Sequence, residues 1–323
     1  MKRMAVLTSG GDAPGMNAAI RAVVRAAVAN DVEIFGVQRG YQGLIDGHIA
    51  PMDARSVSSI IHHGGTILRT ARCPAFMEAS GRAEAAAQLA RLDIAGLVVI
   101  GGDGSYHGAH ALVREHDIAT VGIPGTIDND IGGTQFTIGF DTALNIAVEA
   151  IDRLRDTAAS HDRIFFVEVM GRHSGFIAMY SALAGGAEAL LTPEQPTDIN
   201  GLIASLREAK DRGKTSMIVV VAEGDDAGPA HTIAEHVANA SEFKEPRVAV
   251  IGHLQRGGVP SAFDRVLAAR MGVAAVETLL AGDRDVMIAF EDNALRTRPL
   301  EDAWRLRTRF DPDLFRVLQL LCV

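Results

Sequence analysis

Two aspartates and a threonine in one short stretch are the strongest candidates for chemistry. Thr126, Asp128 and Asp130 follow the apolar run 120–123, which ends at Pro124. Side chains two residues apart point the same way in an extended segment, so the three polar groups can face one cleft. A carboxylate beside a second acid suits proton abstraction next to a metal ion. Because Asp and Asn are also common turn formers, an ordinary turn is the alternative.

A second candidate site follows the apolar run 97–100. Residues 101–105 read Gly-Gly-Asp-Gly-Ser and precede a helical pattern. Such a turn offers backbone N–H groups for phosphates and a carboxylate for Mg²⁺. The glycines here and Gly108 narrowly miss the dinucleotide fingerprint, because their spacing is one residue too long, and no acid ends the next strand at Ile123. We therefore expect phosphate binding without NAD binding.

Glycines also precede the first helical pattern. Residues 8–17 read Thr-Ser-Gly-Gly-Asp-Ala-Pro-Gly-Met-Asn, and Pro14 fits the start of a helix. Glycines at a helix N-terminus allow a phosphate to approach backbone N–H groups. Arg21 and Arg25 are spaced i, i+4 and share one helix face, where either a solvated surface or a second phosphate site is expected.

Arginines follow glycines at further positions. Arg72 comes after a Gly-Gly pair, and Arg172 follows a glycine at the end of a predicted strand. His253 and Arg256 stand three apart in a turn closed by two glycines. Guanidinium groups bind phosphates bidentately, so phosphate recognition is one interpretation and an ordinary surface charge is the other. Cys73, beside Arg72, is more often a packing residue than a nucleophile.

The composition limits the class of protein. The chain has 323 residues, 48% of them apolar, enough for two globular domains. Its 31 basic and 40 acidic residues give a net charge of -9, which argues against a nucleic-acid-binding surface but allows a local basic pocket. Cys73 and Cys322 are the two cysteines, so a reducing compartment is expected. Because no leader pattern and no apolar run of ~18 residues is found, we expect a cytoplasmic protein with no membrane or nucleic-acid partner.

Short apolar runs alternate with glycines and helical patterns along the chain. Strands are expected at 4–7, 34–37, 97–100, 120–123, 164–169, 217–221 and 248–251, and late helices at 262–281 and 302–321. Runs that are apolar on both faces are typical of parallel strands covered by helices on both sides. Ligands of such sheets gather at the carboxyl ends of the strands, where the glycines lie.

Five segments together resemble the bacterial ATP-dependent 6-phosphofructokinase family in order and spacing: 10–17, 101–105, 124–130, 170–172 and 252–258. The resemblance covers essentially the whole chain. It implies two Rossmann-like three-layer α/β/α domains with mainly parallel sheets, an ATP-binding domain at 1–138 plus 254–305 and a sugar-phosphate-binding domain at 139–253 plus 306–323. The implied reaction transfers the γ-phosphoryl group of ATP to the 1-hydroxyl of fructose 6-phosphate, the committed step of glycolysis.

The resemblance also implies roles for residues. Asp128 resembles the base, Asp103 resembles the Mg²⁺ ligand, and the residues that resemble the surroundings of the transferring group are Thr126, Asp130 and Arg172. Residues that resemble ATP contacts are Gly11, Arg72, Cys73, Gly102, Asp103, Gly104, Ser105 and Gly108. Residues that resemble sugar-phosphate contacts are Thr126, Ile127, Asp128, Arg163, Met170, Gly171, Arg172, Glu223, Arg247, His253, Leu254, Gln255 and Arg256. Arg163 and Arg247 match residues that family members supply from a neighbouring subunit, which implies a homotetramer.

The family's effector site, which binds ADP or phosphoenolpyruvate, is matched less fully. The residues that resemble it are Arg21, Arg25, Arg55, Arg155, Gly186, Glu188, Arg212 and Lys214. The loop arginine of the family near position 54 is Ala54 here, with Arg55 one place later, and Ser216 replaces a basic or imidazole residue. Effectors therefore either bind more weakly or use Arg55.

Two alternative functions differ in the ligand or in the chemistry. Pyrophosphate-using relatives carry Asp in place of Gly104 and Lys in place of Gly125, and two glycines leave room for a nucleotide, which favours ATP. A non-catalytic sensor of sugar phosphates or nucleotides is disfavoured because Asp103, Asp128 and Arg172 are all present.

Overall fold

The chain divides into two compact units. The computed structural model describes residues 1–160, 163–308 and 311–322. The first unit contains 1–127, 131–142 and 256–308, and the second contains 128–130, 143–255 and the described part of 309–323. These bounds differ from the domains expected from the sequence at 128–130, 139–142, 254–255 and 306–308.

The first unit is built on a mainly parallel sheet. Among the described residues, seven strands follow the order β11-β10-β5-β4-β1-β2-β3, and only the two edge pairings, β2 with β3 and β10 with β11, are antiparallel. The strands are β1 (Arg3–Thr8), β2 (Glu33–Val37), β3 (Ile49–Met52), β4 (Gly96–Gly101), β5 (Ala119–Pro124), β10 (Val286–Glu291) and β11 (Ala294–Pro299). Helices cover both faces of this sheet, as its apolar strands require.

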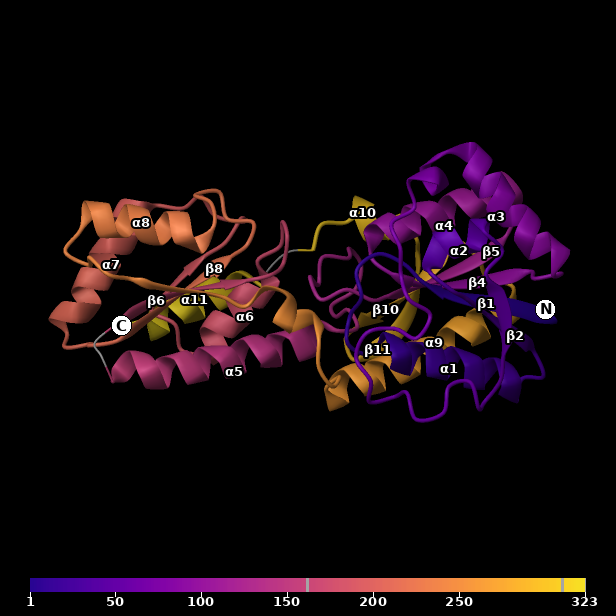
Figure 1. Ribbon diagram of the computed structural model, residues 1–323, viewed down its shortest axis with the longest axis horizontal. Coiled ribbons are helices and arrows are strands. Elements are labelled where there is room, and N and C mark those ends of the chain that lie inside the picture. The colour runs from indigo at the N-terminus through magenta and orange to yellow at the C-terminus, as the bar shows by residue number, and fades with distance from the viewer. Residues whose placement is uncertain (161–162, 309–310, 323) are drawn as a thin grey trace. The chain divides into compact units, whose positions relative to one another are not determined.

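Figure 1 shows α1 and α9 together on one face of the first sheet and α2, α3 and α4 on the other. The helices are α1 (Met16–Ala29), α2 (Gly40–Ile45), α3 (Ala79–Arg91), α4 (Asp103–His116), α9 (Ala262–Ala281) and α10 (Asp302–Arg305), with a short 3-10 helix, η1 (Pro74–Met77). The central strands are fully buried, for example at Leu7 and Val99. This layering leaves the carboxyl ends of the strands to carry the glycine-rich turns.

The second unit has a smaller, fully parallel sheet. In the described residues its order is β7-β8-β6-β9. The strands are β6 (Ile164–Val169), β7 (Ala189–Leu191), β8 (Met217–Ala222) and β9 (Arg247–Val250), and the helices are α5 (Phe140–Ala159), α6 (Phe176–Ala184), α7 (Ile199–Asp211), α8 (Ala230–Ala240) and α11 (Pro312–Leu321), with the 3-10 helix η2 (Gly252–Arg256). α7 and α8 cover one face, and α5, α6 and α11 cover the other (Figure 1). The mainly parallel α/β/α architecture expected from the sequence is confirmed in both units.

The prediction of one helix over 302–321 was wrong. α10 ends at Arg305 and α11 begins at Pro312, after Asp311, whose side chain accepts a hydrogen bond from the Asp313 N–H. Proline lacks the N–H of a helix interior and disfavours helical geometry in the residue before it, so the helical pattern had to break there. Residues 309–310, within the predicted helix, lie outside the described residues.

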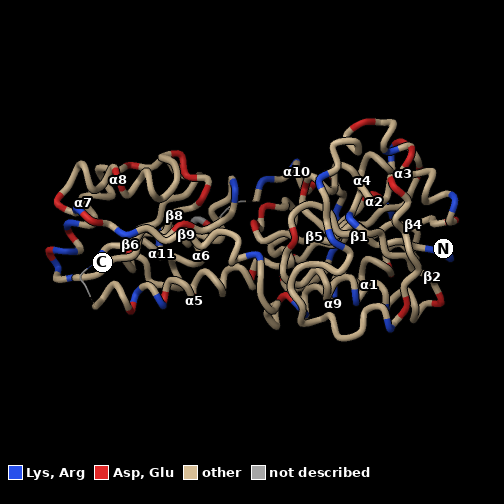
Figure 2. The backbone as a smooth tube through the Cα atoms, in the orientation of Figure 1, with Lys and Arg blue, Asp and Glu red and all other residues tan. Residues whose placement is uncertain are grey.

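Charged residues of both signs occur along both units. Figure 2 shows acidic and basic residues interspersed along the backbone of each unit. Within the part of the chain that the structure describes, no helix is both long enough and apolar enough to cross a bilayer.

Candidate active site

The turn between β1 and α1 is shaped by glycines. Gly10 and Gly15 have φ values of 84° and 103°, a region that favours glycine, and α1 starts directly after Gly15. A Cβ atom at Gly11 would lie 2.6 Å from a terminal guanidinium nitrogen of Arg256, the end of a side chain that can move. The turn thus brings a bare backbone to the N-terminus of a long helix, a common arrangement for phosphate binding.

The segment that leads to Arg72 and Cys73 is tied to this turn. The Asn17 side chain donates to the carbonyls of His63 and Gly64, at 3.1 and 3.0 Å, and accepts from the Ile67 N–H at 2.8 Å. These bonds explain why an asparagine ends the first motif. Arg72 is exposed, whereas Cys73 is half-buried, and burial raises the pKa of its thiol, which disfavours a nucleophilic role.

The turn between β4 and α4 leaves open space beside two of its glycines. Cβ atoms at Gly102 and Gly104 would meet nothing within 4 Å, whereas one at Gly101 would lie 2.5 Å from the Ser9 carbonyl. Asp103 begins α4 with an exposed side chain, and its carboxylate accepts from the Gly104 N–H at 2.6 Å. The arrangement offers helix N–H groups to an anion and a carboxylate to a cation.

The expected free space at Gly125 is absent. A Cβ atom there would lie 3.0 Å from Ile100 and 3.2 Å from Met16. The glycine fits the packing between β4, β5 and α1. Open space beside the backbone, as a nucleotide would need, is therefore found at Gly104 and not at Gly125.

Tyr41 is a supporting residue that the sequence analysis missed. Its hydroxyl donates to the carbonyl of Ser105 at 2.5 Å, and burial raises the pKa of this hydroxyl. Its ring stacks on Phe76 at 3.9 Å, and a Cβ atom at Gly108 would lie 2.8 Å from Phe76. Gly108 thus allows α4 to pack on this pair, and a direct contact of Gly108 with a nucleotide stays a prediction. No motif signal marks a lone tyrosine of this kind.

The loop after β5 is held by the segment that precedes α5. The Ile138 N–H donates to the Pro124 carbonyl at 2.9 Å, and the Thr137 hydroxyl donates to the Thr126 carbonyl at 2.6 Å. Ile127 is fully buried, and its contact with a sugar phosphate stays a prediction. Asp130, three residues further on, is half-buried.

Asp128 and Arg172 lie together in the second unit. Nε of Arg172 is 3.5 Å from Oδ2 of Asp128, and the Asp128 side chain is 3% exposed while that of Arg172 is 57% exposed. The Ser174 hydroxyl donates to the Asp128 carbonyl at 3.0 Å. A buried carboxylate is thus compensated by a cation that remains open to solvent.

The turn that carries Arg172 depends on close backbone approach. Arg172 has a φ of 52°, and Gly171, at 146°, would place a Cβ atom 2.2 Å from the Ser174 carbonyl. A Cβ atom at Gly224 would lie 1.8 Å from the Arg172 carbonyl. Only glycine at 224 lets the end of β8 approach this turn.

Met170, Glu223 and Gln255 meet at the carboxyl ends of the second unit's strands. The Glu223 N–H donates to the Val169 carbonyl at 2.9 Å, and the Gln255 side-chain carbonyl accepts from the Met170 N–H at 2.8 Å. Gln255 is fully buried, whereas the neighbouring His253 and Leu254 are exposed. Gln255 therefore holds the Met170 backbone, whereas the His253 and Leu254 side chains of this turn are open to solvent.

Arg256 lies against the glycine-rich turn between β1 and α1 of the first unit. One terminal nitrogen of its guanidinium donates to the Asp12 carbonyl at 3.1 Å, beside Gly11. From the sequence, Arg256 is expected among the sugar-phosphate residues, and no pattern indicates its contact with Asp12, because the two residues are 244 positions apart.

Arg163 and Arg247 lie at the other end of the second sheet. Arg247 begins β9, Arg163 directly precedes β6, and Phe165 of β6 is in register with Arg247. Arg172 follows the far end of the six-residue strand β6, about 20 Å along the strand direction. Within one copy of this unit, Arg163 and Arg247 therefore lie at the opposite end of β6 from Arg172.

Four of the effector-type residues form a cluster. The Glu188 carboxylate is buried and accepts from the Ile218 N–H at 2.6 Å, with Arg155 and Lys214 each 3.5 Å away. Arg155 also donates to the Gly186 carbonyl at 2.6 Å. In the first unit, Arg21 and Arg25 lie on α1, and Arg55 lies in a turn capped by Asp53, where hydrogen bonds from Ser56 lower the pKa of the Asp53 carboxyl.

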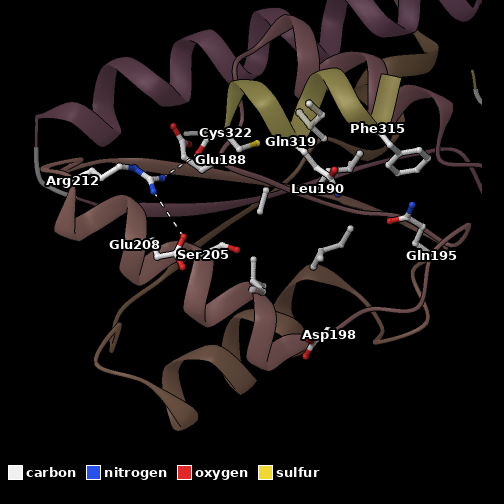
Figure 3. A pocket seen from close by; sticks show the side chains of 14 residues that line it. Glu188, Leu190, Gln195, Asp198, Ser205, Glu208, Arg212, Phe315, Gln319 and Cys322 are labelled. Atoms are coloured by element: carbon white, nitrogen blue, oxygen red, sulfur yellow. Dashed lines mark hydrogen bonds and ion pairs between the residues drawn. The ribbon is translucent and has the colours of Figure 1, made fainter. Parts of the chain in front are cut away.

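Arg212 lies beside a pocket of about 350 Å³ in the second unit. Figure 3 shows this pocket between faces of α7 and α11, with Glu188 at one end. Arg212 is 3.8 Å from Glu208 and donates to the Cys322 carbonyl at 3.3 Å. Leucines and Phe315 supply much of the remaining lining, so Arg212 belongs to an amphipathic pocket next to the Glu188 cluster.

These two α/β units, with glycine-rich turns at the carboxyl ends of their strands, define a protein built to bind phosphorylated ligands. The family model described as Phosphofructokinase matches residues 3–279. The chain is 53% identical over 323 residues to ATP-dependent 6-phosphofructokinase 1 of Thermus thermophilus and 52% identical to the ATP-dependent 6-phosphofructokinase of Bacillus cereus, with full coverage of both chains in each comparison. The chain belongs to the phosphofructokinase family, which confirms the resemblance found in the sequence.

Solved structures agree with this assignment. Phosphofructokinase from Saccharomyces cerevisiae superposes with a TM-score of 0.89 at 33% identity, covering 99% of this chain and 50% of that one, so the present chain spans about half of the yeast chain. A pyrophosphate-dependent phosphofructokinase from Nitrosospira multiformis gives a TM-score of 0.87 at 23% identity, covering 99% of this chain and 92% of that one. The second comparison shows the common fold alone.

Proposed function

We propose that this chain is an ATP-dependent 6-phosphofructokinase, which transfers the γ-phosphoryl group of ATP to the 1-hydroxyl of fructose 6-phosphate. The observation that carries the proposal is the full-length identity of 53% to an ATP-dependent 6-phosphofructokinase. The juxtaposition of Asp128 and Arg172 supports it. Phosphoryl transfer depends mainly on positioning and charge compensation, which the turns and arginines of this chain supply.

The first unit binds ATP in this proposal. The turns at 10–15 and 101–105 offer backbone N–H groups at the N-termini of α1 and α4, where anions are favoured. Arg72 adds a positive charge from a segment anchored by Asn17. Cys73 and Gly108 contribute to the packed wall behind these groups.

The second unit supplies the acceptor chemistry. Asp128 takes the proton of the 1-hydroxyl as the transferred group arrives, and Arg172 compensates the charge that develops on that group. Thr126 and Asp130 flank this base. Glu223, Met170 and His253 lie at the carboxyl ends of the same sheet and bind the sugar phosphate, together with Arg256.

Mg²⁺ fits the residues present. Among the described residues, no group of three or more His, Cys, Asp or Glu side chains is arranged to hold a metal ion. Magnesium is usually held by one or two carboxylates together with substrate phosphates, and the exposed Asp103 is such a carboxylate. When bound, the ion neutralises phosphate charge, and Asp103 orients it.

A homotetramer with shared sites accounts for Arg163 and Arg247. Both residues lie at the opposite end of β6 from Arg172, so a neighbouring subunit is the source of the pair at each sugar phosphate. ADP or phosphoenolpyruvate is proposed to bind the Arg155–Glu188–Lys214 cluster together with Arg21, Arg25 and Arg55. A cytoplasmic location remains a prediction from the sequence.

A screen of donors and acceptors tests the proposal. Purified protein with Mg²⁺ is given ATP or pyrophosphate as donor and fructose 6-phosphate as acceptor, and fructose 1,6-bisphosphate is measured by a coupled assay. Turnover with ATP is expected. Turnover with pyrophosphate alone would assign the pyrophosphate-dependent activity, and ligand binding without turnover would assign a sensor. Unchanged fructose 6-phosphate saturation curves with ADP and phosphoenolpyruvate would remove the effector assignment.

A further inference from the structure

A buried aspartate outside all of the sites described above lies at the start of α9. Asp264 is fully buried, in the first turn of this helix. Ser261 caps the helix by accepting from the Asp264 N–H at 3.1 Å. In the usual capping box the acidic side chain returns to the N–H of the cap residue, but here that N–H donates to the hydroxyl of Thr142 at 2.9 Å. The Asp264 carboxylate therefore does not bind the Ser261 N–H and accepts hydrogen bonds from another element.

That carboxylate accepts three hydrogen bonds from the start of α5. Oδ1 accepts from the Gly139 N–H at 2.9 Å, and Oδ2 accepts from the Thr142 N–H at 2.8 Å and from the Thr142 hydroxyl at 2.5 Å. Two of the three donors are backbone N–H groups that a helix N-terminus leaves unpaired, and a negative charge is favoured there. Asp264 therefore fixes residues 139–142.

Residues 137–138, directly before this segment, hold the loop that leads to Asp128. The Ile138 N–H donates to the Pro124 carbonyl, and the Thr137 hydroxyl donates to the Thr126 carbonyl. Asp264 is thus linked to Thr126 in three steps. It accepts a hydrogen bond from Gly139, the chain runs from residue 139 back to residue 137, and Thr137 donates to the Thr126 carbonyl.

The turn between β1 and α1 packs on residues 138–139. A Cβ atom at Gly15 would lie 2.7 Å from the Ile138 side chain and 3.5 Å from Cβ of Asp264. One at Gly139 would lie 2.6 Å from Cβ of Ala13. Both glycines also have positive φ values, so a side chain is disfavoured at either position by the close packing and by the backbone conformation.

We propose that Asp264 is a positioning residue for phosphoryl transfer, whose ionised carboxylate aligns the Thr126 loop with the turn at residues 13–15. The inference rests on the proposed function. Asp264 contacts no substrate in this role. It acts through Gly139 and Thr142.

The protonation state of Asp264 controls this arrangement. Burial raises the pKa of Asp264 to about 6, against hydrogen bonds from Thr142 and Gly139 that lower it, and the charge of Asp141 on α5 adds to the rise. On α9, the neighbouring Arg265 donates to the Pro260 carbonyl, and residues 13–15 are uncharged. A protonated carboxyl carries a hydrogen on one of its two oxygens. That hydrogen would face the N–H and O–H donors at the start of α5, so a protonated Asp264 does not keep all three accepted hydrogen bonds.

Stability and activity should respond to pH in opposite directions. Because the folded pKa lies above the ordinary value of an aspartate, the folded state binds this proton more tightly than the unfolded state does. The contribution of Asp264 to stability therefore rises as pH falls through about 6. Activity should fall over the same range, because the ionised form positions the loops.

Two variants and a control test the proposal, with kcat and the KM for ATP measured from pH 5 to 8.5. Thr142→Val keeps the carboxylate but removes a hydrogen bond that lowers its pKa, so the acid limb of kcat should move to higher pH by about one unit. Asp264→Asn should lower kcat by roughly 10- to 100-fold at neutral pH, since loop alignment is disturbed, while losing little stability. Asp283→Asn, an exposed site just after α9, should match the wild type.

The outcomes separate this inference from the proposed function. Substrate phosphates titrate in the same pH range, so the comparison is made between variants in the same buffers. An acid limb of Thr142→Val that coincides with that of the wild type would overturn the positioning role, even if Asp264→Asn fails to fold. A wild type without turnover at any pH would instead remove the kinase assignment, and ATP binding by calorimetry at pH 7.5 and 5.5 would then report on the alignment of the turn at 13–15.

Discussion

The exposed guanidinium of Arg172 lies 3.5 Å from the buried carboxylate of Asp128, and the two residues come from different turns, one after β6 and the other after β5. The Ser174 N–H donates to the Gly171 carbonyl and the Ser174 hydroxyl donates to the Asp128 carbonyl, so Ser174 ties the two turns together. A buried carboxylate beside one solvent-exposed guanidinium suits the proposed roles, in which Asp128 accepts a proton and Arg172 compensates the charge of the transferred group.

Replacement of the base is the first test. Asp128→Ser should lower kcat by ~10² or more, because proton abstraction is lost, while the KM for fructose 6-phosphate stays broadly unchanged. Steady-state kinetics with both substrates measure this split. Asp283→Asn serves as the matched loss of an acidic charge, and a loss confined to KM in Asp128→Ser would contradict the role of the base.

Arg172→Lys tests whether the planar guanidinium is needed. A lysine keeps the charge but loses the forked donors, so kcat should fall by roughly 10- to 100-fold. The double variant Asp128→Ser/Arg172→Lys should lose less than the product of the two single losses, because the residues act as a unit. Fully multiplicative losses in the kinetic cycle would show that the two side chains work independently.

The sequence predicted the central strands well because each is a continuous apolar run followed by a glycine. It missed β3, β7, β10 and β11. β7 has only three residues, β3 contains Pro51, and β11 carries two arginines because it is an edge strand with a solvated face. β10 is apolar and could have been found, from the Asp292-Asn293 pair that turns it into β11 with positive φ at both residues.

The site was predicted from motifs, whereas its supports were not. Asp128 and Arg172 each stand in a recognisable turn, but the contact of Arg256 with Asp12 and the bonds of Asp264 to α5 join residues more than one hundred positions apart. Such pairings depend on how the layers pack, and no spacing rule within one segment encodes them. Ser261 with an acid three residues later has the pattern of a capping box, yet the carboxylate of that acid accepts hydrogen bonds from a different helix.

Gly104 provides a test of the nucleotide turn. Gly104→Asp should fold normally, since a side chain there meets open space and an acid is favoured in the first turn of a helix. Its negative charge would repel the phosphates of ATP, so the KM for ATP should rise by at least about tenfold, the effect of ~1.4 kcal/mol. Gly104→Ala is the control for size. Equal KM values for ATP in the Asp and Ala variants would place the phosphates elsewhere.

Gly11 and Gly43 separate a ligand effect from a folding effect. A Cβ atom at Gly11 would meet only the end of the Arg256 side chain, which can move, whereas one at Gly43 would lie 1.6 Å from the Gln38 carbonyl. Gly11→Ala should therefore keep the wild-type Tm while raising the KM for ATP by roughly tenfold, as one methyl group does in a fitted site. Gly43→Ala should lower the Tm. A lowered Tm in Gly11→Ala would assign that glycine to the fold.

Arg247 tests the sharing of sites between subunits. Arg247→Ala should raise the KM for fructose 6-phosphate by roughly 10- to 100-fold with a smaller change in kcat, since hydrogen bonds between charged groups are removed from the bound phosphate. The sharper measurement mixes this variant with Asp128→Ser, refolds the two together and assays the hybrids at low fructose 6-phosphate concentration. If each site takes Asp128 from one subunit and Arg247 from another, some hybrid sites contain both native residues, and activity should exceed that of either parent. Hybrids no more active than the sum of their parents would place both residues at the site of a single chain, which the separation of Arg247 and Arg172 along the second sheet argues against.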